Sequence, residues 1–196
     1  DLTRYLGLLT AGHLPFDEVV PGVVSNLFDF DSDVASAARA AAAALKHVPS
    51  LQTHIEVIRG ELMGADRLKR SLAARALGTL RDRKSIPTLI DMVGSIDAME
   101  RYSAHASLKE ISRADFGLDA SAWQLWWNEA QTQRRAEWLV LALSESPLEL
   151  RRSAIDELSA AQGTTLGYHA HAPAPEREES IDRWMSLLAA RPDFDV

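Results

Sequence analysis

A helix, a short polar turn and a second helix recur as one unit along this chain of 196 residues. The clearest copy reads LKRSLAARALGTLRDRKSIPTLIDMV, from Leu68 to Val93. Three copies align on the small residue and leucine that close each first helix, at positions 44–45, 76–77 and 107–108, so the leucines lie 32 and 31 residues apart. Self-similarity at this period is typical of stacked helical repeats, and the sequence therefore predicts an all-α chain built as an α-solenoid of antiparallel helix pairs.

Apolar residues recur at helical spacing along nearly the whole chain, and no long stretch alternates apolar and polar residues as a half-buried strand would. The pattern predicts helices over Leu2–Ala11, Phe16–Leu27, Val34–His47, Leu51–Leu62, Arg67–Leu80, Ile86–Gly94, Ala98–Ser112, Ser121–Gln133, Ala136–Leu143, Leu148–Gln162 and Glu176–Ala190. Glycines and prolines between 163 and 175 predict a surface loop before the last helix.

The first helix of the central copy divides into two halves on a helical wheel. The predicted buried half holds Leu68, Leu72, Ala73, Ala76, Leu77 and Leu80, and the predicted outer half holds Arg67, Arg70, Ser71, Ala74 and Gly78. Ser85 is predicted to cap the second helix, and Pro87 falls in its first turn, where its missing N–H costs nothing.

Within the central copy, Ala76, Leu77 and Gly78 close the first helix, Asp82 lies in the turn and Pro87 begins the second helix. With these residues the copy resembles the bacterial HEAT-type repeat, including that of phycobilin-lyase-like HEAT proteins. The segment 115–130 resembles a tryptophan-rich tail often joined to such repeats. The resemblance implies one solenoid domain over 1–196, with its best repeats at 34–62, 67–94 and 98–130 and an irregular cap at 134–196.

Composition limits the class of protein. The chain has no cysteine, which excludes disulfides, thiolate metal sites and cysteine nucleophiles. It holds no run of about 18 apolar residues, so we expect no membrane span and a cytoplasmic location. Its first residue is Asp1, which suggests a piece of a longer protein, and its excess of arginine and alanine is typical of a GC-rich bacterial genome.

Residues that could carry chemistry also have structural interpretations. Trp123, Trp126 and Trp127 could stack on a ligand, but their spacing with Ala130 is that of one buried helix face. The DxDxD run at 29–33 lacks the later glycine and glutamate of a calcium loop, so we expect helix capping instead. His169 and His171 have no third metal ligand at a recognisable spacing. We expect no enzyme activity, no cofactor and no metal.

The charge is unevenly distributed. The net charge is −7, yet residues 63–84 carry 7 basic and 2 acidic side chains. These basic residues could meet an acidic partner or a phosphate backbone, or simply form a solvated face. They are Arg67, Lys69, Arg70, Arg75, Arg81, Arg83 and Lys84.

The repeat predicts a binding function, because stacked helix pairs leave one face of each second helix open to a partner. On the central second helix, Ile86, Leu89, Ile90 and Val93 should pack inward. The predicted partner-facing residues are Thr88, Asp91, Met92 and Ser95, with His54, Arg59, Gln124 and Asn128 on neighbouring helices.

The leading hypothesis is a non-catalytic protein-interaction scaffold or adaptor that binds another protein or peptide. One alternative is nucleic-acid binding, because some HEAT-like solenoids resemble alkylpurine DNA glycosylases that set an aspartate among tryptophans, as Asp119 and Asp182 are placed here. The acidic net charge opposes that alternative. A second alternative is a lyase-like or chaperone-like role on a pigment protein, which rests on the shared repeat alone.

Overall fold

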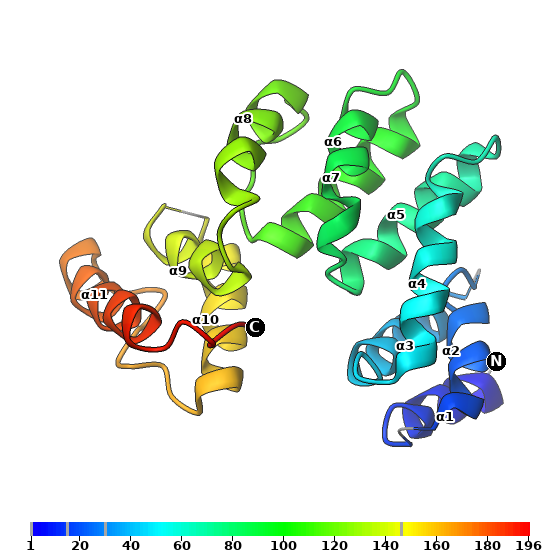
Figure 1. The fold of residues 1–196 in the computed structure, drawn as a ribbon, viewed down its shortest axis with the longest axis horizontal. Coiled ribbons are helices and arrows are strands. Elements are labelled where there is room, and N and C mark those ends of the chain that lie inside the picture. The colour runs from blue at the N-terminus through cyan, green and yellow to red at the C-terminus, as the bar shows by residue number, and fades with distance from the viewer. Residues whose placement is uncertain (1, 15, 30, 146) are drawn as a thin grey trace. The chain divides into compact units, whose positions relative to one another are not determined.

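The computed structural model describes residues 2–14, 16–29, 31–145 and 147–196 (Figure 1). Over these residues the chain forms α-helices and two 3₁₀-helices and contains no strand. The prediction of an all-α chain is therefore confirmed. The chain divides into two compact units, Asp1–Ile111 and Ser112–Val196. Whether the two form one continuous solenoid domain stays a prediction.

The first unit is a succession of short helices joined by tight turns (Figure 1). Helix α1 packs against α3, α2 against α3 and α4 against α5. The elements are α1 (Leu2–Ala11), η1 (Asp17–Val19), α2 (Val20–Ser25), α3 (Ser32–Ala44), α4 (Pro49–Glu61), α5 (Arg67–Thr79), η2 (Arg83–Ser85), α6 (Ile86–Val93) and α7 (Ala98–Ser112).

Aspartate side chains cap the N-termini of four of the described helices. Asp31 accepts hydrogen bonds from the N–H groups of Asp33 and Val34 at the start of α3. Asp66, Asp97 and Asp119 play the same part at α5, α7 and α8 (Ala120–Ala130), satisfying N–H groups that have no partner within the helix. The expected capping role of the DxDxD run is thus confirmed at Asp31.

The turn between α5 and α6 differs from prediction in one detail. Ser85 is the residue before α6, as predicted, but its hydroxyl makes no capping bond and donates instead to the carbonyl of Asp82, 2.7 Å away. A 3₁₀-helix over Arg83–Ser85 leads directly into α6, and Pro87 lies in the first turn of that helix as expected. The helical backbone at Ser85 leaves its side chain facing back into the turn.

The buried side of α5 is broader than the wheel predicts. Ser71, Ala74 and Gly78, predicted to face outward, are buried, whereas Leu68 is exposed. The Ser107 hydroxyl of α7 lies 2.8 Å from the carbonyl oxygen of Ala74 and 2.7 Å from that of Ser103. Small residues on this side allow α7 to approach the α5 backbone closely, which a hydrophobicity pattern does not register.

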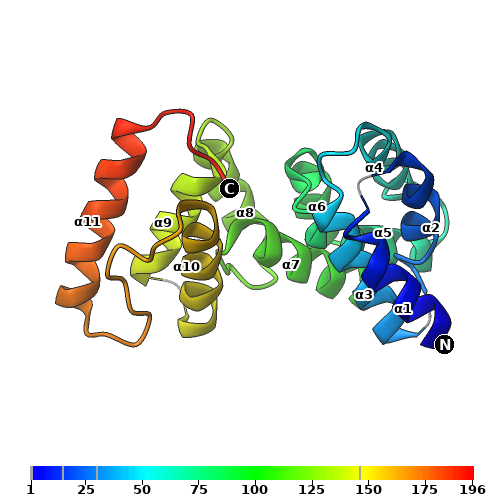
Figure 2. The same ribbon diagram turned by 90° about the horizontal axis from the view of Figure 1, so that it is seen from below.

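The second unit holds α8 (Ala120–Ala130), α9 (Arg135–Glu145), α10 (Leu148–Gln162) and α11 (Ala174–Ala190). Helices α10 and α11 both pack against α9 (Figure 2). Their core includes Leu139, Leu158 and Trp184. Tyr168 from the predicted surface loop also enters this core, and its hydroxyl donates to the Leu143 carbonyl at 2.7 Å. The loop is therefore partly an internal element.

The bounds of most predicted helices lie within three residues of the observed bounds. One predicted α-helix differs in its helix type over part of its length. The helix expected over Phe16–Leu27 is a 3₁₀-helix followed by the six-residue α2. No helix within the described residues is long and apolar enough to cross a membrane.

Candidate binding surfaces

An apolar groove lies in the first unit, where α5 packs against α4. We name it the α4–α5 groove. Its volume is about 430 Å³, and its lining is mostly carbon. The residues that line it are Val24, Phe28, His54, Val57, Ile58, Glu61, Asp66, Leu68, Lys69 and Leu72.

Two aliphatic side chains at the α4–α5 groove are open to water. Val57 is 62% exposed and Leu68 is 46% exposed. The floor is formed by Ile58, which is buried, and by Leu72 and Phe28, which are half-buried. Apolar surface that is concave and left uncovered is typical of sites for a ligand or a partner protein.

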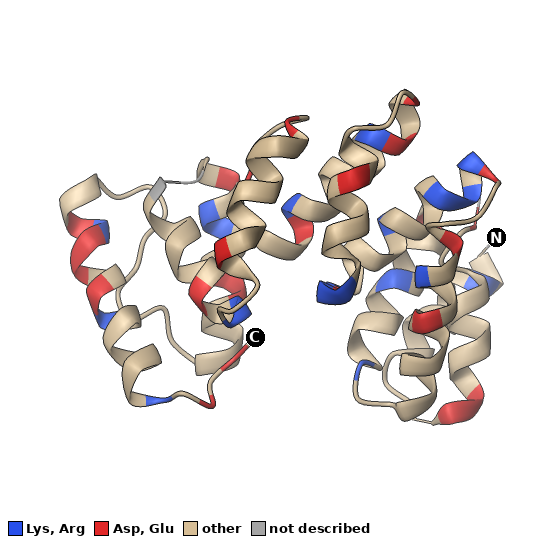
Figure 3. Cartoon of the chain, turned by 45° about the horizontal axis from the view of Figure 1, so that its top comes forward, with Lys and Arg blue, Asp and Glu red and all other residues tan. Residues whose placement is uncertain are grey.

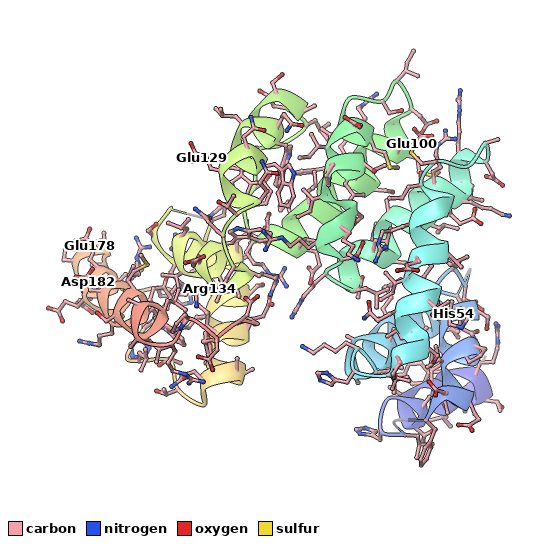
Figure 4. All side chains as sticks on the ribbon, in the orientation of Figure 1. His54, Glu100, Glu129, Arg134, Glu178 and Asp182 are labelled. Carbon is pink, nitrogen blue, oxygen red and sulfur yellow. The ribbon has the colours of Figure 1, made fainter. Side chains whose placement is uncertain are left out.

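Four polar side chains also line the groove, namely His54, Glu61, Asp66 and Lys69. His54 lies midway along α4 (Figure 4). The Asp66 carboxylate accepts from the N–H groups of Leu68 at 2.9 Å and Lys69 at 3.2 Å. This capping role fixes Asp66 and orients the first turn of α5, from which Leu68 and Lys69 project at the groove.

The predicted partner-facing surface of α6 is smaller than expected. Ile86, Leu89, Ile90 and Val93 are buried, which confirms the predicted packing face. Met92, predicted to be free for contact, is only 7% exposed, and that prediction is wrong. Met92 follows Leu89 by three residues and therefore extends the same buried face.

Three other predicted residues of this surface have different surroundings. Asp91 is exposed and Thr88 is half-buried. The Ser95 hydroxyl donates to a carboxylate oxygen of Glu100 at 2.7 Å. Their role in binding stays a prediction.

Arg59, predicted to contact a partner, is held by another residue of the chain. Its Nε lies 2.7 Å from Asp82 Oδ2, and its Nη2 lies 3.3 Å from Asp82 Oδ1. The pair is mostly buried and ties α4 to the turn after α5. The aspartate that carries the HEAT resemblance thus has a structural partner, and Arg59 is not an open contact.

The basic stretch 67–84 does not form one continuous surface. Helix α5 is 13 residues and therefore about 20 Å long, and it separates Arg67, Lys69 and Arg70 at its start from Arg81, Arg83 and Lys84 beyond its end. Figure 3 shows Lys and Arg interspersed with Asp and Glu over the described chain. Arg75 is exposed between them.

The basic residues at the start of α5 also differ in how open they are. Arg70 is paired with the mostly buried Glu100, which Figure 4 labels at the start of α7, with 3.1 Å between Arg70 Nε and Glu100 Oε1. Arg67 forms a looser pair with Asp97 at 3.6 Å and keeps most of its side chain exposed. Lys69 is exposed as well. Arg67 and Lys69 are therefore the cations most available beside the groove.

The tryptophans form an aromatic cluster in the second unit with Phe116 and Trp138. Trp123 is fully buried, and its indole N–H donates to the Gly117 carbonyl at 2.9 Å. Trp126 and Trp127 are half-buried and pack against Trp138, with centroid distances of 5.3 and 6.1 Å. The predicted core position is thus confirmed for Trp123 and holds only in part for the other two.

The remaining candidates are accounted for by local structure. Gln124 and Asn128 are exposed on α8 and hydrogen-bond to each other at 3.0 Å. Asp119 caps α8, and Asp182 lies exposed on α11 (Figure 4). His169 and His171 are exposed. In the part of the chain that the structure describes, no group of three or more His, Cys, Asp or Glu side chains could hold a metal ion.

The residues that open the groove were not among the sequence candidates. Val57 follows Glu56 on a helix face that is otherwise polar. An isolated aliphatic residue on a polar face is the one sequence signal that could have indicated an exposed apolar site there. Leu68 was assigned to the buried half of its helix.

No family model matches this chain, and no curated protein shows significant similarity to it.

Proposed function

We propose that this chain is a non-catalytic binding module whose α4–α5 groove receives the apolar face of a helix from a partner protein. The observation that carries the proposal is the groove itself, with about 430 Å³ of mostly apolar space and with Val57 and Leu68 exposed at its rim. Leaving such surface in water is unfavourable by about 25 cal/mol per Å². A partner that covers it gains that free energy on binding.

The chemistry of the partner follows from the apolar lining of the groove and from the charged residues that line it. Large aliphatic or aromatic side chains spaced three and four residues apart would fill it, as in other helix-in-groove complexes. The charges at the groove are mixed, because Glu61, Asp66 and Lys69 all line it and so set no sign for the partner's flanking residues. The expected partner element is therefore an amphipathic helix.

We also propose that the helix pairs of the first unit belong to the HEAT-type α-solenoid class. Three observations support this. Helix α4 packs against α5, Pro87 lies in the first turn of α6, and Asp82 anchors the turn between α5 and α6 through Arg59. Solenoids of this class bind their partners through extended concave surfaces.

Nucleic-acid binding receives less support. The two groups of basic residues lie at opposite ends of α5, and Arg70 at one of them is paired with Glu100. The chain as a whole carries a net charge of −7, whereas a duplex-binding surface requires a broad positive field.

The test is a comparison of captured proteins, followed by direct binding. The full chain and its Val57→Ser/Leu68→Ser double variant are used as baits, with Leu125→Ser, an exposed leucine of the second unit, as the matched control. The proposal expects a protein retained by the wild type and the control and lost by the double variant.

The retained protein is then purified, and its amphipathic segment is titrated against each variant. Affinity should fall at least about tenfold in the groove variant, since two aliphatic contacts are lost. An Asp91→Arg variant tests the α6 surface in parallel. If Asp91→Arg abolishes binding and the groove variant does not, the groove assignment is wrong.

A further inference from the structure

A second cavity lies within the second unit and is independent of the α4–α5 groove. Its volume is about 280 Å³, and we name it the aromatic pocket. Three rings from three separate segments line it, namely Phe116 before α8, Trp126 of α8 and Trp138 of α9. The Trp126 centroid lies 5.3 Å from that of Trp138 and 6.4 Å from that of Phe116, so the rings form one continuous wall.

The rings are held in place by contacts outside the pocket. The Trp138 indole N–H donates to the Ala130 carbonyl at 3.1 Å, and the ring is only 2% exposed, so it backs the pocket behind Trp126. Trp126 packs edge-on against the fully buried Trp123, with centroids 5.7 Å apart. Phe116 meets Trp123 edge-on as well, at 4.9 Å. Fixed aromatic walls of this kind bind cations through the negative potential of the ring faces.

Two charged side chains also line the pocket, and their surroundings differ. The Arg113 guanidinium is mostly buried and bound by Glu157, with 2.6 Å between Nε and Oε1. Asp115 is exposed, and its Oδ1 accepts from the Gly117 N–H at 2.9 Å, which orients the carboxylate at the pocket wall.

The surrounding field favours a positive ligand. The Glu157 carboxylate binds both Arg113 and Arg135. These three buried side chains together carry one net positive charge, which the negative charge of Asp115 offsets. Residues 112–196 as a whole carry 14 acidic and 8 basic side chains, a net charge of −6. A cation approaching this unit is therefore attracted, and an anion is repelled.

We infer that the aromatic pocket binds an organic cation of the quaternary ammonium class, with its methyl groups against the rings of Phe116 and Trp126 and its charge facing Asp115. A methylated ammonium suits this lining better than a primary one. It needs no hydrogen-bond acceptors, and the lining is mostly apolar, so it loses little on leaving water.

The test uses choline as the probe and 3,3-dimethyl-1-butanol as its uncharged analogue of the same shape. Each is titrated into the full chain by calorimetry and tryptophan fluorescence. The inference expects choline to bind at least about tenfold more tightly than the neutral analogue. Equal binding of the two, or no binding of choline, would overturn it.

Variants locate the site. Phe116→Ala removes one ring, and Asp115→Asn removes the charge while keeping an oxygen for the Gly117 N–H. Each should weaken choline binding several-fold, whereas Tyr102→Ala, an exposed aromatic of the first unit, should leave it unchanged. Should Phe116→Ala fail to fold, Asp115→Asn still decides the question. Choline affinity unchanged in Asp115→Asn would contradict the assigned geometry.

Discussion

Gly78 of α5 lies directly against Ser107 of α7, so closely that a β-carbon built on the glycine would come within 2.7 Å of the serine's Cα, Cβ and Oγ. One of these atoms belongs to the backbone and cannot be moved by a side-chain rotation. The glycine that closes the central repeat motif is therefore required by packing, because it lets two helices of the first unit approach at backbone distance.

Gly78→Ala should destabilise the chain by about 1–3 kcal/mol, since α5 or α7 must shift to admit the methyl group. Gly60→Ala is the matched control, as it also lies within a helix but has no atom within 4 Å of the added carbon. It should be neutral or stabilising by up to about 1 kcal/mol. Urea denaturation of both variants makes the comparison, and equal effects would contradict the close approach.

Asp82→Ala should cost about 1–3 kcal/mol of unfolding free energy, because it leaves the mostly buried Arg59 guanidinium without its carboxylate. Arg59→Lys, made in the wild-type background, should retain only part of the interaction with Asp82, since an ammonium cannot match both carboxylate oxygens. A double-mutant cycle over the two positions measures their coupling. The exposed pair of Arg67 and Asp97 is the control and should show about 0–1 kcal/mol.

Glu157→Ala should be the most destabilising single charge removal in the second unit, by about 3–5 kcal/mol. Its two oxygens bind Arg113 and Arg135 at 2.6 and 2.7 Å, and all three side chains are mostly buried. Glu179→Ala removes an exposed carboxylate from its pair with Arg183 and should change stability by at most about 0.5 kcal/mol. Similar losses in the two variants, measured by thermal unfolding, would show that burial does not govern the effect.

Glu137 should make the stability of the chain depend on acid pH. Burial raises the pKa of this carboxyl, but hydrogen bonds from the Arg134 N–H and guanidinium outweigh burial and lower the pKa below its ordinary 4.5. Because the pKa is lower in the folded chain than in the unfolded one, the stabilisation is present above pH 4.5 and is lost as the pH falls through the folded value.

The pair is partly exposed, so the contribution of Glu137 should stay below about 1 kcal/mol. Glu137→Gln should unfold slightly more easily at neutral pH and lose less stability between neutral and acid pH than the wild type. Denaturant midpoints measured at both pH values provide the check. An unchanged acid dependence in the variant would mean that Glu137 titrates alike in both states.

Local signals in the sequence were sufficient to place most helices. The bounds of α7 and α10 were predicted to the residue, because each begins and ends where the apolar period meets polar or turn residues. The prediction of one α-helix over Phe16–Leu27 is wrong, because the chain there forms a 3₁₀-helix before the short α2. Periodicity alone does not separate these two helical forms.

Which side of a helix is buried was harder to predict. Ser71, Ala74 and Gly78 carry little hydrophobic signal, yet all three are buried. At Ala74 and Gly78 small size, and not hydrophobicity, allows α7 to approach. Leu68 carries a strong signal and is exposed. The α4–α5 groove depends on how α4 meets α5 in three dimensions, so no pattern within one helix could reveal it. The same holds for the aromatic pocket, whose rings come from three segments.

Hydrogen–deuterium exchange of the full chain, free and bound to its captured partner, tests the binding account most directly. We expect slower exchange on binding at the second half of α4 and the first turns of α5, over residues 54–72, because the partner covers the groove lined by those turns. Slower exchange confined to α6 or to the second unit, with residues 54–72 unchanged, would contradict the assignment of the groove as the binding site.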